Sequence, residues 1–386
     1  MDAVAVAELS EQARAAGRLG IDTEFMGEGR YRALLCLVQI AVEVPQDGVR
    51  VAVLDPLGEG FDPAPLAALL ADPAVEVVMH AGRQDVALLR REWKTDIRGI
   101  FDTQLAAGFA GLRAQLGYEA LLSEVAGVRL HKSASFTRWD ARPLSDEQVA
   151  YAREDVLHLL ELADGLQERL RARGRLEWAR EECRALEASS DERDPDAIFA
   201  RLPRVNTLDP AQRAVARELA GWREAAARDA DRPAPSVLSD AALVEIAKRR
   251  PDSLARLGQI RGLHEGIVRR RGRAILEAVA RGREAEPIAV VGERTPLPDA
   301  TDAPLVALGE ALVRTRAAEE GLAYELIAAR ADLQRVVTAV RLDGVEPAVR
   351  TLEGWRREVV GAELLELLRG RRALRVGSAR RIEVLP

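Results

Sequence analysis

The chain has 386 residues, of which 48% are hydrophobic, and a formal net charge of −6 at pH 7. It is longer than one ordinary domain, so we expect two or three domains with cores of their own. No run approaches the roughly 18 uncharged apolar residues of a transmembrane helix, and the first residues lack the segments of a signal peptide, which predicts a cytoplasmic protein without a membrane partner.

Up to about residue 110, strand-like runs alternate with helical patterns, which predicts a mixed α/β sheet covered by helices. The first strand-like run ends in IDTEF and carries Asp22 and Glu24. Successive strand residues point to opposite faces, so these two carboxylates share a face and repel each other. A hard divalent cation between them would relieve the repulsion. The alternative, which this stretch alone favours, is a solvent-facing strand end.

A third acidic position follows a later strand. The run VEVVMHA predicts a strand that ends at His80 and leads into a helix beginning near Arg83, which places Asp85 in the first helical turn. Sites in α/β sheets are commonly built at the ends of strands. Taken singly, Asp85 is equally explained as an acid that favours the helix dipole.

From Thr103 to about Leu186 the pattern is almost wholly helical. The exception is the polar and aromatic segment 131–145, which we expect to be a loop near the functional site. Ser145 then caps a helix on which Tyr151 and Asp155 lie four residues apart, on one face and one turn from each other. Taken alone, this pair is explained as helix surface.

The C-terminal half reads as helices separated by Pro-rich connections, which predicts two small helical domains. The segment from Val205 to Arg283 has sixteen basic and ten acidic residues, so it is basic within an acidic chain. Its basic residues predict a phosphate-binding surface, although a charge run is also typical of a solvated face: Lys248, Arg249, Arg250, Arg269, Arg270, Arg271 and Arg273. Trp222 and Trp355 stand in apolar helical contexts and are interpreted as core residues.

Several blocks, taken in order, resemble ribonuclease D, a DEDD exonuclease family of the tyrosine subclass. They are IDTEF, LVQIA, LDPL, HAGRQD, FDTQLAA, KSASFTRWDARPL and YAREDVLHLLEL, and they cover about residues 19–170. The loop block departs from the family pattern, which more often has a basic residue at Phe136, an acid at Arg138 and an apolar residue at Asp140. The N-terminal strand of the family is abbreviated here to MDAVAV before the first helix.

A second resemblance concerns the helical half. The segment from ELAGWREAAARDADRP to RRRGRAILEAV resembles the HRDC module, and a weaker echo from LVALGEALVRTRAAEE to LEGWRREVVGAELLELLRG suggests a second copy. The resemblances together imply an RNase H-like mixed-sheet α/β exonuclease domain followed by two small all-α HRDC-like domains. The implied boundaries are 1–200 for the exonuclease, 205–285 for the first HRDC domain, 286–301 for a linker and 302–376 for the second.

The resemblance implies a 3′-to-5′ exoribonuclease with two divalent cations, Mg²⁺ or Mn²⁺, which suit all-oxygen ligands. It assigns Asp22 to both ions, Glu24 and Asp155 to the side of the attacking water, and Asp85 to the leaving-group side. It assigns Tyr151 to orienting that water. The two cysteines, at positions 36 and 183, lack metal-ligand spacing, so neither zinc nor a disulfide framework is expected.

For the substrate we expect RNA with single-stranded 3′ tails, tRNA precursors among them, bound by a monomer. Phe25 and Met26 are candidates for stacking on the terminal base, with core packing as the alternative. His80 and Gln84 are candidates for contacts to the terminal ribose or phosphate, and His80 is equally explained as a satisfied strand-end histidine. Two other functions stay open: a DNA 3′-to-5′ repair or proofreading exonuclease, and a catalytically silent RNA-binding scaffold.

Overall fold

The computed structural model describes residues 3–113, 115–130, 138–289, 299–342, 344–377 and 380–386. Phe136, with residues 131–137 of the predicted loop 131–145 and residues 290–298 of the predicted linker 286–301, lies outside these ranges. Helix α1 (Ala3–Ala16) begins at Ala3, so the described residues 3–6 of the segment expected ahead of the first helix are themselves helical. No helix in the described ranges is long and apolar enough to cross a membrane.

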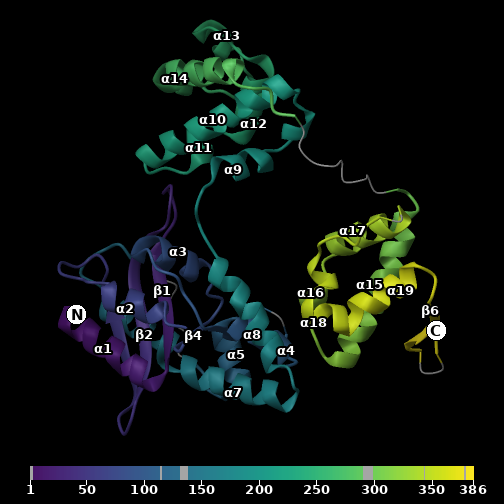
Figure 1. Ribbon diagram of the computed structural model, residues 1–386. Coiled ribbons are helices and arrows are strands. Elements are labelled where there is room, and N and C mark those ends of the chain that lie inside the picture. Colours follow the sequence, from purple (N-terminus) through teal and green to yellow (C-terminus); the bar gives the residue numbers. More distant parts are fainter. Residues whose placement is uncertain (1–2, 114, 131–137, 290–298, 343, 378–379) are drawn as a thin grey trace.

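The N-terminal region is built on a five-stranded mixed sheet in the order β3-β2-β1-β4-β5 (Figure 1). β1 (Arg18–Met26), β2 (Leu34–Val44) and β3 (Gly48–Leu54) form an antiparallel meander. β4 (Glu76–Met79) pairs in parallel with β1, and β5 (Ile100–Asp102) in parallel with β4. This arrangement confirms the predicted mixed sheet.

Helices cover both faces of the sheet. On one face, α1, α2 (Ala64–Leu70) and α3 (Arg83–Trp93) share a core with the β1 residues Leu19 and Ile21. The opposite face is covered by five helices: α4 (Thr103–Phe109), α5 (Tyr118–Val125), α6 (Asp146–Leu157), α7 (Leu159–Ala172) and α8 (Leu176–Arg184). Gly20 faces α7, and a Cβ there would lie 3.4 Å from Leu159, so the glycine lets this helix approach the sheet closely.

The first helical domain has its own hydrophobic core. After α9 (Pro195–Arg201), it comprises α10 (Pro210–Asp229), α11 (Ala234–Val237), α12 (Asp240–Arg249), α13 (Leu254–Gly258) and α14 (Glu265–Glu284). The long helices α10 and α14 cross at Gly282, where a Cβ would stand 2.5 Å from Val215 Cα. Trp222 is half-buried and packs against this core, as expected.

The second helical domain begins, like the first, with a long helix that is followed by a very short one and one of medium length. It has α15 (Asp302–Glu320), α16 (Tyr324–Ile327) and α17 (Arg330–Arg341), and then a stretch from Gly354 to Leu368 composed of α18 (Gly354–Arg356), a π-helical turn (Arg357–Gly361) and α19 (Ala362–Leu368). It ends in an antiparallel hairpin of β6 (Ala373–Val376) and β7 (Ile382–Leu385), which the sequence analysis did not predict.

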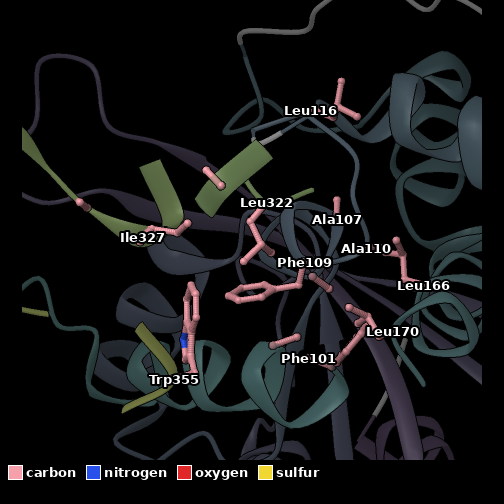
Figure 2. Packing of buried hydrophobic residues seen from close by; sticks show 14 of the residues in the cluster. Phe101, Ala107, Phe109, Ala110, Leu116, Leu166, Leu170, Leu322, Ile327 and Trp355 are labelled. Carbon is pink, nitrogen blue, oxygen red and sulfur yellow. The ribbon is translucent and has the colours of Figure 1, made fainter. Parts of the chain in front are cut away.

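The second helical domain packs directly on the exonuclease region through Trp355. This side chain is 2% exposed, stacks on Trp178 of α8 at 5.3 Å and meets the ring of Phe109 of α4 edge-on at 5.1 Å. Figure 2 shows Phe109 between Trp355 and Leu322 of this domain. Arg356 adds an ion pair to Glu182 at 2.6 Å. Trp355 is therefore a core residue, as expected, but of a core shared between two domains.

Candidate active site

Strand β1 carries the first two carboxylates on the face that α6 covers. Because Asp22 and Glu24 lie two residues apart, they share this face, while Thr23 between them points to the other side. The Thr23 hydroxyl donates a hydrogen bond to the carboxylate of Asp85. A bulge between Glu24 and Phe25 ends the regular pairing of β1 with β2, at the position where the strand passes the site.

Asp85 reaches the site from the adjacent strand. β4 runs parallel to β1 and ends at Met79, and α3 begins at Arg83, as predicted, so Asp85 lies in the first helical turn. The turn is fixed by Asp102, whose carboxylate accepts a hydrogen bond of 2.8 Å from the Gly82 backbone N–H. Asp85 is 8% exposed. It therefore stands beside the end of β1, where the strand-to-helix pattern placed it.

Helix α6 supplies the remaining two predicted residues. Its N-terminus has the expected cap, a capping box in which Ser145 accepts from the Gln148 N–H and Gln148 reaches back to Ser145. Tyr151 and Asp155 follow on one face of this helix, which packs over β1, β2 and β3. Tyr151 contacts the cluster formed by Cys36, Leu37, Trp139 and Ala152, and its ring centroid lies 5.9 Å from that of Trp139.

The four carboxyl groups act on one another. Burial raises the pKa of Asp22 well above its usual range, and the charges of Asp85, Asp155 and Glu24 raise it further. Burial, together with Asp155 and Asp85, raises the pKa of Glu24 to about 8. Burial and the charge of Glu154 raise the pKa of Asp155 to about 7. Such shifts arise when acids are enclosed together without a compensating cation.

Burial also raises the pKa of Asp85, although its hydrogen bond from Thr23 works in the opposite direction. The pKa of Tyr151 is raised by burial and by the charges of Asp155, Glu24 and Asp22, so its phenol keeps its proton at neutral pH. The site thus combines four acids that resist ionisation with a tyrosine that remains a hydrogen-bond donor.

These residues fit divalent metal ions by the chemistry of their donors. Carboxylate oxygens are the ligands that Mg²⁺ and Mn²⁺ take, and positive charge among these acids would remove the repulsion that raises their pKa values. Within the ranges that the structure describes, no three His, Cys, Asp or Glu side chains already surround a common point as ligands.

Two residues beside the site were not singled out from the sequence. Gln39 of β2 lies opposite Asp22 in the strand register, is 0% exposed, and has neither amide atom paired among the described residues. Tyr118 at the start of α5 is mostly buried, and the charges of Asp155 and Asp22 contribute to a raised pKa. A glutamine inside the apolar run LVQIA was the available signal for Gln39, since a buried amide calls for partners.

The predicted substrate contacts fall into separate places. Met26 packs with Tyr151 on the carboxylate face, whereas Phe25 packs on the opposite side of β1. Phe25 and Gln84 line one pocket together. His80 is half-buried, with its Nδ1 2.9 Å from Thr103 Oγ1, which favours the interpretation as a satisfied strand-end histidine.

Four of the basic residues predicted to bind phosphate lie on α14 of the first helical domain, whereas Lys248 and Arg249 end α12 and Arg250 follows it. Arg269, Arg270 and Arg273 are exposed and Arg271 is half-buried. Arg270 and Arg271 line an open groove of about 460 Å³ together with Trp222 of α10. In the loop block, Arg138 forms an ion pair of 3.0 Å with Asp140.

Comparison with known proteins supports this fold. Residues 1–171 match the family described as 3′-5′ exonuclease, and residues 212–279 match the HRDC domain. A ribonuclease D of Acidiphilium cryptum is 37% identical over 385 residues, covering 99% of this chain and 95% of the relative. A ribonuclease D of Gluconacetobacter diazotrophicus is 38% identical over 368 residues, covering 94% and 90%.

Among solved structures, the crystal structure of Escherichia coli RNase D, described as an exoribonuclease involved in structured RNA processing, has a TM-score of 0.82 at 28% identity. The match covers 96% of this chain and 97% of that one. It therefore extends over the exonuclease region and both helical domains.

A mixed sheet with interacting carboxylates from β1, α3 and α6 and a tyrosine on α6, within a segment that matches 3′-5′ exonucleases, defines an enzyme of that class. The fold indicates dependence on divalent metal ions. The chain belongs to the ribonuclease D family and is a hydrolytic exoribonuclease. Its HRDC domain indicates that it binds nucleic acid outside the catalytic domain as well.

Proposed function

We propose that this enzyme trims single nucleotides from the 3′ ends of RNA by two-metal-ion hydrolysis and that its substrates include tRNA precursors with 3′ tails. The observation that supports this proposal is the mutual influence of Asp22, Glu24, Asp85 and Asp155, which the fold brings from β1, α3 and α6 to one place. We further propose that the protein acts as a monomer in the cytoplasm.

Two divalent ions, Mg²⁺ or Mn²⁺, would supply a nucleophile at neutral pH and stabilise the leaving 3′-oxygen. Asp22 would hold both ions, since the other three acids stand around it. Glu24 and Asp155 would hold the ion on the side of the attacking water, and Asp85, fixed by Thr23, would act on the leaving-group side. Tyr151 keeps its proton, so its role is to orient the attacking water by hydrogen bonding.

The test of this function is a time course on an RNA with a single-stranded 3′ extension and on its DNA counterpart, with Mg²⁺ or Mn²⁺. We expect stepwise release of nucleoside 5′-monophosphates from the RNA, and none in EDTA. Equal or faster trimming of the DNA would identify a DNA exonuclease instead. Binding of the RNA without trimming of the RNA or the DNA would identify an RNA-binding scaffold.

Removal of the Tyr151 hydroxyl tests the orienting role. Tyr151→Phe is expected to lower kcat about 100-fold with little change in KM, because positioned hydrogen bonding to the attacking group contributes on that order. Single-turnover kinetics on a 3′-tailed RNA measure this effect. Tyr324→Phe, which removes a hydroxyl in the second helical domain, is the matched control. A kcat of Tyr151→Phe within twofold of the parent would exclude the proposed role.

The two helical domains are proposed to hold the body of the RNA while its 3′ end occupies the active site. The exposed arginines of α14 and the groove beside Trp222 support this role for the first domain. We propose that the second domain is a further HRDC copy, because its first three helices, α15, α16 and α17, have 19, 4 and 12 residues, against 20, 4 and 10 for α10, α11 and α12. The boundaries 1–200, 205–285 and 302–376 with linker 286–301 are kept as our proposed division.

Neutralising the exposed arginines of α14 tests the RNA-binding role. The triple variant Arg269→Gln, Arg270→Gln, Arg273→Gln is expected to reduce the slope of log K against log salt by about 2, since each phosphate contact to a single strand contributes about 0.7. Fluorescence anisotropy over a salt series measures it. Arg281→Gln on the same helix is the control, because Arg281 is paired with Glu218. An unchanged slope in the triple variant would show that these arginines do not contact the phosphates of the RNA.

A further inference from the structure

A pocket of about 470 Å³ lies where the exonuclease region meets the first helical domain. Its walls come from the loop after β1, from the first turns of α3 and from the segment at 189–193 ahead of α9. Phe25, directly after Glu24, and Gln84, directly before Asp85, both line it, but none of the four catalytic carboxylates does. The pocket is therefore adjacent to the active site and distinct from it.

Three buried polar atoms in the walls of this pocket have no hydrogen-bond partner among the described residues. They are Ser189 Oγ, Arg32 Nε and Asp191 Oδ1. Ser189 is 7% exposed, so its hydroxyl has little access to bulk water. Buried polar groups in folded proteins are almost always paired with protein, ordered water or a ligand. Each of these atoms has less than 1 Å² of accessible surface, so its side chain must turn toward the pocket to pair with a molecule there. Three unpaired polar groups in the walls of one pocket make it a candidate site for a polar molecule.

The chemistry of the walls specifies the kind of molecule. Arg32 Nε offers a donor, Asp191 Oδ1 an acceptor and the Ser189 hydroxyl either. Phe25 and Leu88 add apolar surface. Arg83 is exposed at the rim, and no carboxylate in the described ranges forms an ion pair with it. These walls suit a molecule with a flat apolar body, a hydrogen-bonding edge and a negative charge, and a nucleotide has all three. The volume of the pocket falls within the roughly 300–1,000 Å³ of small-ligand sites.

We propose that this pocket binds one nucleotide of the RNA strand, away from the bond that is cleaved. This assignment rests on the proposed function for the source of the nucleotide, because a free mononucleotide has the same chemistry. The base lies against the apolar wall, and an amino group on its edge donates to Asp191 Oδ1, which favours adenine, cytosine or guanine over uracil. Arg83 and Arg32 are placed to attract the phosphate.

The first helical domain holds one wall of this pocket in place. Tyr31 of the loop after β1 is 7% exposed, and its hydroxyl donates to Glu224 of α10 at 3.0 Å. Asp231 accepts from the Tyr31 backbone N–H at 3.1 Å. Arg193, which also lines the pocket, pairs with the same Glu224 at 2.6 Å. A nucleotide in the pocket therefore contacts groups that join the two domains.

The test is calorimetric binding of AMP to the full-length protein in EDTA, which removes metal from the carboxylate site. Ser189→Leu, which fills the pocket, is expected to weaken AMP about tenfold, the equivalent of losing one or two hydrogen bonds. Ser189→Ala, which removes the hydroxyl without adding bulk, is expected to weaken AMP binding about threefold. Because alanine is smaller than serine, this variant tests the hydroxyl even if Ser189→Leu fails to fold. Ser236→Leu, at an exposed site of the first helical domain, is the matched control. IMP, which lacks the amino group, is expected to bind more weakly than AMP.

A second arm identifies the source of the nucleotide, using anisotropy of a single-stranded A-tailed RNA in EDTA. Weaker binding of both AMP and the RNA by Ser189→Leu supports the proposal. A loss confined to AMP assigns the pocket to free mononucleotides and overturns the assignment to the RNA strand. Undetectable AMP binding, or AMP binding that neither Ser189 variant changes, overturns the nucleotide site. Because this assay involves no hydrolysis, failure of the proposed catalytic function appears separately, as absence of trimming with metal.

Discussion

Asp22→Asn is expected to lower kcat on a 3′-tailed RNA by about 1,000-fold or more, because loss of metal-ion charge stabilisation amounts to several kcal/mol. Asp22 is the acid whose pKa is raised by all three of the other carboxylates, so it lies at the electrostatic centre of the set. RNA affinity in EDTA is expected to stay the same, since none of the RNA contacts proposed above involves the Asp22 side chain once metal is removed. Single-turnover kinetics and anisotropy on the same preparation separate the two effects.

The same substitution is expected to stabilise the metal-free protein at alkaline pH. The Asp22 carboxylate is half-buried among like charges, and asparagine removes that repulsion at nearly constant volume. Asp47→Asn, at an exposed turn between β2 and β3, is the control and should alter neither activity nor stability. A variant that loses both activity and folding would mean that Asp22 is structural, and near-parent activity would place the catalytic centre elsewhere.

Local chemistry made much of this site predictable from sequence. The alternation of a strand puts Asp22 and Glu24 on one face wherever that strand lies. A helix that starts just after a strand end puts Asp85 in its first turn, and the Ser145 cap fixes the phase of the helix that carries Tyr151. Each of these inferences depends on a few neighbouring residues, and the structure agrees with each one.

What the sequence did not reveal depends on residues that meet across the fold. The place of Gln39 opposite Asp22 follows from the register of two strands, which no local pattern sets. Trp355 was recognisable as a core residue, but its partners Phe109 and Trp178 lie far away in the chain. Alternation separates Phe25 from Met26, but the partners that pack on each side of β1 follow from the tertiary fold.

Stability of the metal-free enzyme is expected to fall as pH rises from about 4 to 8, and divalent metal is expected to reverse the trend. The folded-state pKa is about 7 for Asp155 and about 8 for Glu24, against ordinary values of 3.8 and 4.5. In this window the folded protein keeps protons that the unfolded chain has released. Stability must then decrease with pH through the window and level off above the folded-state values.

Metal ions compete with these protons, since they bind the ionised carboxylates. The rise in Tm on adding excess Mg²⁺ or Mn²⁺ to the EDTA-treated protein should therefore be small near pH 5.5 and reach at least about 5 °C near pH 8.5, where a few kcal/mol of repulsion is relieved. Scanning calorimetry at both pH values measures it. Asp22→Asn should reduce the metal-dependent rise at alkaline pH. A metal effect of equal size at both pH values would show that these four carboxylates are not the ligands.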